Sequence, residues 1–238
     1  IIAIMAPHAG HIYSGPVAGY AFAAIQHLNP ELVAVVSPMH HPYPYKLLTS
    51  SHRAYATPLG SIPIDHQAVA KLDHFLKDIL GFGLTPVAHD QEHSLEIELP
   101  FLQRALKNDF KLLPVMVREQ SSRVAQALGK GLAEVTRNRN ALLVASTDLS
   151  HFYPQAIANQ LDREVLRRVE NFDPQGVLSA EEEGKGFACG RGALAAVMWA
   201  AQHLGANKVY ILNYATSGDV TGDYSQVVGY GAAVMTRE

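Results

Sequence analysis

The sequence has a single cysteine, Cys189, and no long apolar segment. One cysteine excludes an internal disulfide, so nothing in the sequence indicates an oxidising compartment. The longest apolar runs, such as residues 1–7 and 32–36, have the length of buried strands and are far too short to cross a bilayer. No signal peptide is visible, and we expect a cytoplasmic protein without a membrane partner.

The sequence also has little excess charge of either sign. The chain has 19 Lys and Arg against 22 Asp and Glu, for a net charge of −3, and it contains no run of basic residues. This balance argues against nucleic acid as a partner. The 18 glycines and 13 prolines are scattered, and no repeat or linker divides the chain. We therefore predict a single domain over residues 1–238 with a sizeable apolar core.

Several common catalytic motifs are absent. The sequence contains no H-E-x-x-H helix, no G-x-S-x-G elbow and no P-loop. Cys189 has no arginine six residues later, which excludes the cysteine-phosphatase loop. Two alternatives remain: a mixed histidine and cysteine metal site, or a Cys–His catalytic pair.

Apolar strands alternate with helices along most of the chain. The expected strands cover residues 1–6, 32–37, 111–117, 141–146, 208–213 and 227–236. The expected helices cover residues 15–28, 65–80 with Asp65 as N-cap, 92–107 with a kink or break at Pro100, 121–137, 155–171 and 190–204. Residues 45–50 and 54–63 predict a peripheral hairpin. Continuous apolar strands separated by helices predict an α/β fold, with a largely parallel central sheet covered by helices on both faces.

Histidines follow three of the predicted strands. His8 comes after the first strand, the pair His40 and His41 after the second, and Asp148 with His151 after residues 141–146. Tyr214 and Ser217 follow residues 208–213. Ligands of open α/β sheets bind beyond the carboxyl ends of the strands, so this pattern predicts a shared site at one edge. Adjacent side chains diverge, so only one of the histidine pair can join such a site.

Cys189 directly precedes a predicted helix, in the segment Ala188-Cys189-Gly190-Arg191. The amides and dipole of a helix start stabilise a thiolate and lower its pKa, and Arg191 adds a positive charge. A thiolate there would be a nucleophile or a soft metal ligand. The alternative is that Cys189 is an inert small apolar residue.

His93 and Glu96 are three residues apart in the predicted helix over residues 92–107. That spacing places them on one helix face and suits a carboxylate that supports a histidine, or a proton shuttle. A solvated acidic helix start would explain the same residues.

Five motifs occur in order over nearly the whole chain. They are Ala6-Pro7-His8-Ala9-Gly10, Ser37-Pro38-Met39-His40-His41, Glu92-His93-Ser94-Leu95-Glu96, Ser146-Thr147-Asp148-Leu149-Ser150-His151 and Cys189-Gly190-Arg191. Together they resemble the Memo family, whose prokaryotic members are also called AmmeMemoRadiSam system protein B. Family members usually begin some tens of residues earlier, and this chain opens in what reads as a buried strand. We therefore expect a segment before Ile1.

The resemblance implies a fold similar to class III extradiol dioxygenases of the LigB type. It also implies that His8, His40 and Cys189 form a metal site, with Asp148 and His151 lining the same pocket. Iron and copper are the metals associated with the family, and zinc would also suit these ligands. A functional link to AMMECR1-like and radical SAM proteins is implied as well.

The ligand set differs from that of the dioxygenases, which hold Fe(II) with two histidines and one carboxylate. Here the third ligand would be the Cys189 thiolate, which donates more electron density and can itself be oxidised. We therefore expect a redox-active, iron- or copper-dependent oxidoreductase rather than a ring-cleaving enzyme. Asp148 and His151 would transfer protons or orient substrate, and His93 with Glu96 would support the site.

Two other functions fit the same residues. One is a Cys–His hydrolase or transferase with Cys189 as nucleophile and His8 or His151 as base. The other is a non-enzymatic protein whose pocket binds a peptide or another partner.

Overall fold

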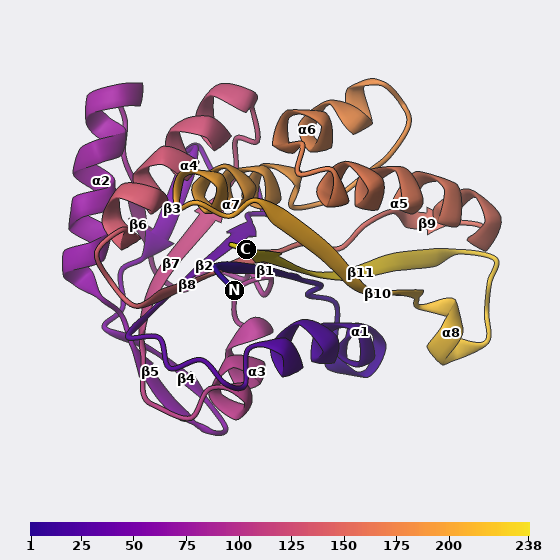
Figure 1. Ribbon diagram of the computed structural model, residues 1–238, viewed down its shortest axis with the longest axis horizontal. Helices are drawn as coiled ribbons and strands as arrows, with labels where there is room; N and C mark the ends of the chain where they lie inside the picture. The colour runs from indigo at the N-terminus through magenta and orange to yellow at the C-terminus, as the bar shows by residue number, and fades with distance from the viewer.

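The computed structural model describes all of residues 1–238, arranged around one central sheet (Figure 1). Its strands are β1 (Ala3–Ala6), β2 (Leu32–Pro38), β3 (Leu47–Ser50), β4 (Ala54–Thr57), β5 (Gly60–Pro63), β6 (Thr85–Val87), β7 (Lys111–Val117), β8 (Ala141–Ser146), β9 (His151–Tyr153), β10 (Lys208–Thr216) and β11 (Val227–Thr236). Its helices are α1 (His11–Ala24), α2 (His66–Leu80), α3 (Glu98–Ala105), α4 (Ser122–Thr136), α5 (Gln155–Glu170), α6 (Pro174–Glu182), α7 (Arg191–His203) and α8 (Gly218–Thr221).

The strand order in the central sheet is β10-β11-β1-β8-β2-β7-β3-β6, and β9 pairs with β11 beside this path. The four central strands β1, β8, β2 and β7 are parallel. Strand β11 runs antiparallel to both β1 and β10, and β3 runs antiparallel to β7. The predicted α/β class with a largely parallel sheet is confirmed. Strands β1 and β2 follow each other in the sheet's sequence order and are parallel, and β8 lies between them.

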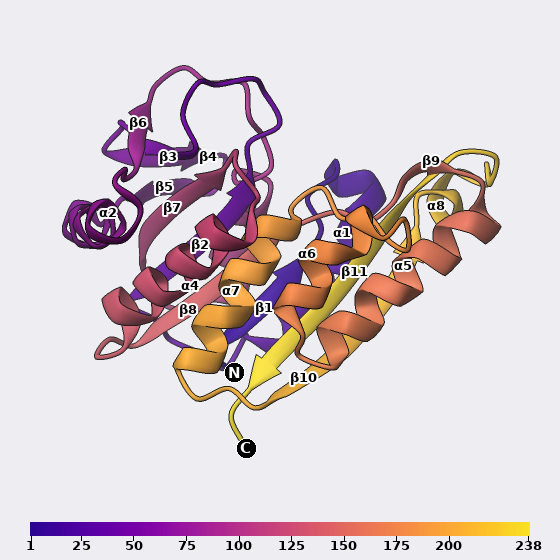
Figure 2. The same cartoon turned by 90° about the horizontal axis from the view of Figure 1, so that it is seen from above.

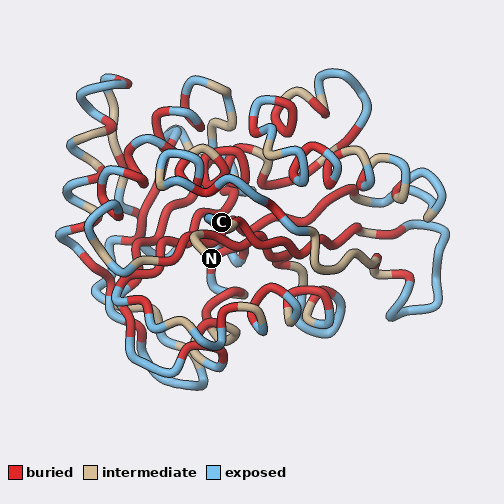
Figure 3. Tube along the Cα trace, in the orientation of Figure 1, coloured by how far each residue is buried: buried red, intermediate tan, exposed pale blue.

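Each face of the sheet has its own apolar core, because the central strands are apolar at nearly every position. In β2, Leu32, Ala34 and Val36 face one cluster of 43 buried residues, and Val33 and Val35 face another of 26. Helices α4, α5, α6 and α7 cover the first face, and α1 and α3 cover the second (Figures 1 and 2). The strands between these layers are almost entirely buried (Figure 3).

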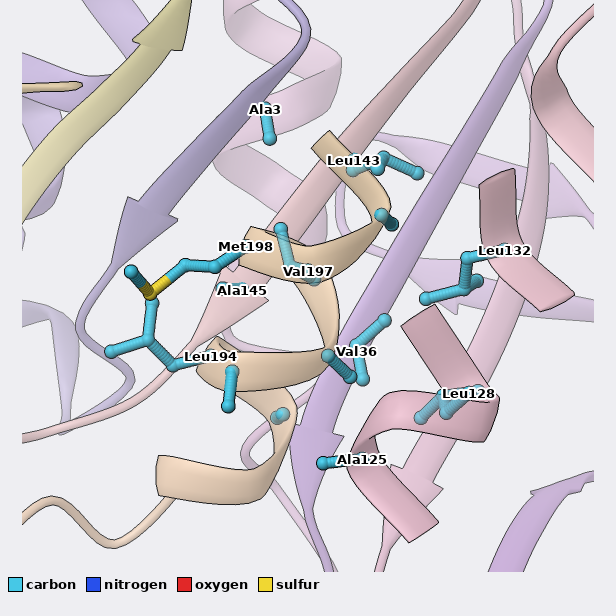
Figure 4. Close-up of a cluster of buried hydrophobic side chains, with 14 of the residues drawn as sticks. Ala3, Val36, Ala125, Leu128, Leu132, Leu143, Ala145, Leu194, Val197 and Met198 are labelled. Atoms are coloured by element: carbon cyan, nitrogen blue, oxygen red, sulfur yellow. The ribbon is translucent and has the colours of Figure 1, made fainter. Parts of the chain in front are cut away.

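Helices α4 and α7 pack closely against each other because their contact surfaces carry small residues. Figure 4 shows Leu194, Val197 and Met198 of α7 among the side chains of this larger core. A Cβ on Gly129 of α4 would lie 2.7 Å from the carbonyl oxygen of Ala196 in α7, so only glycine permits this approach. The packing fixes where α7 begins, which is one side of the candidate site.

Several expected elements keep their type with altered ends. Residues 111–117, 141–146 and 227–236 form the expected strands, and Asp65 caps α2 by accepting a hydrogen bond from the amide of Ala68. Helix α1 begins and ends four residues earlier than predicted. Residues 54–63 form the β4–β5 hairpin, but the prediction for residues 45–50 was wrong, because β3 joins the central sheet. No helix in the chain combines the length and apolar character needed to span a membrane.

The helix predicted over residues 92–107 is wrong in its first half. Residues 94–97 form turns, and α3 starts only at Glu98. The carboxylate of Glu92 accepts hydrogen bonds from the amides of His93 and Ser94, and such local side-chain bonds compete with helix formation. Pro100 neither kinks nor divides the helix, because it lies in the first turn, where its missing N–H has no helical partner to lose.

Candidate metal centre

Three donor side chains meet beyond the carboxyl edge of the parallel strands. His8 lies two residues after β1, His40 two residues after β2, and Cys189 just before α7. One ligand atom from each of the three lies within 4.8 Å of the other two. The structure therefore brings together the three residues for which the sequence predicted a metal-binding role.

Cys189 reaches the site through contacts with the end of β8. Its Sγ accepts a hydrogen bond from the amide of Asp148 at 3.2 Å and lies 3.4 Å from Nε2 of His8. The amide of Gly190 donates to Oγ1 of Thr147 at 2.9 Å. A Cβ on Gly190 would lie only 2.5 Å from the carbonyl oxygen of Ser146, so glycine is required for this approach.

The predicted low pKa of the Cys189 thiol is wrong. Burial raises the thiol pKa well above its ordinary value, and the negative charge of Asp148 adds to the effect. Arg191 does not counter this, because its guanidinium pairs with Glu181 of α6. The sulfur therefore stays a protonated thiol unless a cation binds beside it, which weighs against a free thiolate nucleophile.

Glu92 holds the ring and backbone of His40. Nδ1 of His40 lies 3.0 Å from Oε1 of Glu92, and the His40 amide also donates to this carboxylate. The hydrogen bond with Glu92 raises the pKa of His40. Burial would raise the pKa of Glu92, but the hydrogen bonds from His40 and Ser94 outweigh it and hold that pKa far below its ordinary value. With Nδ1 engaged, Nε2 is the His40 nitrogen that remains for a ligand.

Ser146 and Asp148 hold the ring and backbone of His8. Its Nδ1 lies 2.8 Å from Oγ of Ser146, and its amide donates to Oδ1 of Asp148 at 2.8 Å. Burial lowers the pKa of His8 well below its ordinary value, and the neighbouring His40 and His93 lower it further. A neutral imidazole with Nε2 directed at the Cys189 sulfur is the form that binds a metal.

Asp148 and His151 line the site without joining the ligand cluster. Asp148 is buried, and burial raises its pKa to about 6 although the amide of His8 donates to it. Nδ1 of His151 bonds to the carbonyl oxygen of Leu149 at 2.8 Å, and its ring packs edge-on against Phe187. The charge of His151 acts on both Asp148 and His8, so all three groups are near one another.

His93 lies over the ligand cluster, whereas Glu96 does not. The His93 ring centroid is 6.1 Å from that of His8 and 6.0 Å from that of His40. Glu96 is exposed and forms no hydrogen bond or ion pair with the site. The predicted His93–Glu96 pairing was wrong because residues 94–97 are not helical. The supporting carboxylate is Glu92, which lies in the same motif and is not among the predicted site residues.

The three donors suit a transition-metal ion. Two imidazole nitrogens and one thiol form a mixed N and S set, which fits copper, iron or zinc better than magnesium or calcium. The second nitrogen of each histidine is hydrogen-bonded, to Glu92 for His40 and to Ser146 for His8. Such partners fix ring orientation at protein metal sites. The residues present therefore fit a bound metal.

Comparisons with known proteins agree in family and fold. The family model described as "Memo-like protein" matches residues 1–234. A "MEMO1 family protein" of Nitrosopumilus maritimus is 38% identical over 98% of this chain and 83% of its own length. A MEMO1 family protein of Methanopyrus kandleri is 37% identical over 98% of this chain and 83% of its own length. The crystal structure of the uncharacterized protein JW3007 from Escherichia coli K12 covers 98% of both chains with a TM-score of 0.53, and its 14% identity limits the likeness to the fold.

Proposed function

Because the chain belongs to the family of Memo-like proteins, we propose that it is a redox-active metalloprotein that binds one iron or copper ion through His8, His40 and Cys189. The observation that carries this proposal is the convergence of the three donor atoms within 4.8 Å. A bound ion would accept and release electrons and lower the pKa of the thiol.

The surrounding residues match the needs of such a centre. Neutral His8 offers Nε2, and His40 offers Nε2 because Glu92 holds its Nδ1. The side chain of His40 is 38% exposed and that of His93 is 54% exposed, so the cluster opens to solvent on their side. A small-molecule substrate would approach from this side.

Three groups beside the ligands can exchange protons with a substrate. Asp148, whose pKa is raised to about 6, changes charge close to neutral pH. His93 faces the ligand rings, and His151 lies close enough for its charge to act on Asp148. In this proposal, Asp148, His93 and His151 orient a substrate and transfer its protons. Glu92 fixes the orientation of the His40 ring through the hydrogen bond with Nδ1.

The proposal is tested by anaerobic purification followed by metal analysis and an absorption spectrum. We expect close to one iron or copper per chain and a thiolate-to-metal charge-transfer band that disappears in Cys189→Ala. His40→Gln should lose the metal, and His41→Gln is the matched control that should keep it, because adjacent side chains diverge. Metal-free protein from repeated preparations, or equal loss in both histidine variants, would refute the assignment.

The metal analysis and an alkylation assay together separate the alternatives. Zinc without iron or copper would leave the ligand assignment intact and remove the redox role, since zinc does not change oxidation state. Rapid alkylation of Cys189 at neutral pH in metal-free protein would favour the Cys–His nucleophile, which the raised thiol pKa argues against.

A further inference from the structure

Behind His8, the hydroxyl of Ser146 lies close to three polar atoms. Its Oγ is 2.8 Å from Nδ1 of His8, 2.8 Å from the carbonyl oxygen of Ser94 and 2.6 Å from Oε1 of Glu98. All three distances are hydrogen-bond lengths. Each contact therefore needs one hydrogen atom between the two heavy atoms.

The positions of these three hydrogens follow from the chemistry of the groups. The Ser94 carbonyl has no hydrogen, so the single Ser146 hydroxyl hydrogen must point at it. The two lone pairs of Ser146 Oγ then accept from the other two neighbours. Consequently His8 carries its hydrogen on Nδ1, and Glu98 carries a proton on Oε1.

We infer that Glu98 is a neutral carboxylic acid that donates its proton to Ser146, and that these two residues hold His8 with its hydrogen on Nδ1. The significance for metal binding rests on the proposed function, since Nε2 of His8 is the proposed ligand atom. The protonation pattern itself rests only on the hydrogen-bond geometry.

The surroundings of Glu98 support a neutral acid. The residue is 0% exposed, its Oε2 has no hydrogen-bond partner, and no cationic side chain pairs with it. Burial raises its pKa well above the ordinary value, and the nearby charge of Asp148 acts in the same direction. The start of α3 favours an anion at this position, but that effect is smaller than the cost of burying an unpaired carboxylate.

Glu98 thereby makes the two histidines unequal as ligands. An ionised carboxylate, Glu92, stands behind His40 and makes its ring a stronger electron donor. A neutral hydroxyl and a neutral acid stand behind His8, so that ring is the weaker donor. Glu98 is a positioning residue that acts on His8 through Ser146.

The tautomer of His8 is measured by nitrogen-15 NMR of histidine-labelled, metal-free protein. We expect the wild-type His8 signal to show hydrogen on Nδ1 and a free Nε2. Glu98→Gln should preserve this tautomer, because its amide N–H can replace the acid O–H, whereas Ser146→Ala should lose the preference. A wild-type His8 with its hydrogen on Nε2 would overturn the inference without any variant having to fold.

The proton on Glu98 is measured by infrared spectroscopy of the metal-free protein. At about pH 8, where Asp148 with its pKa of about 6 is ionised, we expect a carbonyl band of a protonated carboxylic acid. The band should vanish in Glu98→Gln and persist in Glu96→Gln, a matched control that removes an exposed glutamate two residues away. A spectrum unchanged by Glu98→Gln would refute the neutral acid. Both measurements use metal-free protein, so their outcome is independent of whether the protein binds iron or copper.

Discussion

Replacing Glu92 with glutamine tests whether this carboxylate sets the strength of the proposed metal site. Its two oxygens accept hydrogen bonds from Nδ1 and the amide of His40 and from the amides of His93 and Ser94. Glutamine keeps the size of the side chain but offers one oxygen, and its NH₂ group would face N–H donors. The variant therefore loses at least one charge-assisted hydrogen bond to His40 and leaves that ring free to turn.

Loss of such a supporting residue weakens metal binding by about 10–100-fold, which corresponds to about 1.4–2.7 kcal/mol. Competition with a chelator of known affinity at fixed pH measures this change directly. Glu96→Gln is the matched control, because it removes the same charge from an exposed position in the same segment. A Glu92→Gln affinity within about threefold of the wild type would refute the supporting role.

The same variant has a predictable pH dependence of stability. The pKa of Glu92 is lowered in the folded state, so its contribution is present above the ordinary value of 4.5 and is lost as the pH falls through the folded value. The pKa of His40 is raised, so its contribution is present below 6.5 and is lost as the pH rises through the folded value. The stability gap between wild type and Glu92→Gln should be largest between pH 4.5 and 6.5.

Three further predictions concern stability. Gly190→Ala should destabilise the protein by about 1–3 kcal/mol in urea unfolding, because its Cβ would meet the Ser146 carbonyl oxygen; an unchanged midpoint would contradict the close packing. Asp65→Ala should cost about 1 kcal/mol through loss of the cap on the amide of Ala68, and an equal melting temperature would argue against it. Above pH 4.5, wild-type Glu98 must take up a proton on folding, whereas glutamine does not. The stability of Glu98→Gln relative to the wild type should therefore rise by about 1.4 kcal/mol per pH unit until the raised folded pKa is reached. Parallel pH profiles for these two proteins would contradict the buried acid.

The edge of the sheet where the site lies could be predicted from local patterns. Apolar runs located β1, β2 and β8, and the rule for parallel strands placed the residues that follow them at one edge. That rule selects His8 and one of the pair His40 and His41. The family resemblance implies His40 and adds Cys189, which also precedes a predicted helix. The structure brings the three together, while their role as metal ligands stays a prediction.

The residues that support the ligands could not be found this way, because their roles depend on contacts distant in sequence. A helix over residues 92–107 favours Glu96 as the supporting carboxylate, but residues 94–97 form turns and Glu92 makes the contact with His40. Ser146 and Glu98 meet across 48 positions, and only the packed structure shows that Glu98 is buried. The thiol pKa of Cys189 was predicted in the wrong direction because the helix start was weighed without the cost of burial.

Strand β1, which ends two residues before His8, lies between β8, which begins at Ala141, and β11, which begins at Val227. During synthesis the first of these partners appears only after more than half of the chain has been made, and the second near its end. Neither half of the polypeptide can assemble the three donors alone. Uptake of the proposed metal ion would therefore require a complete sheet, and it would distinguish fully folded molecules from partly folded ones.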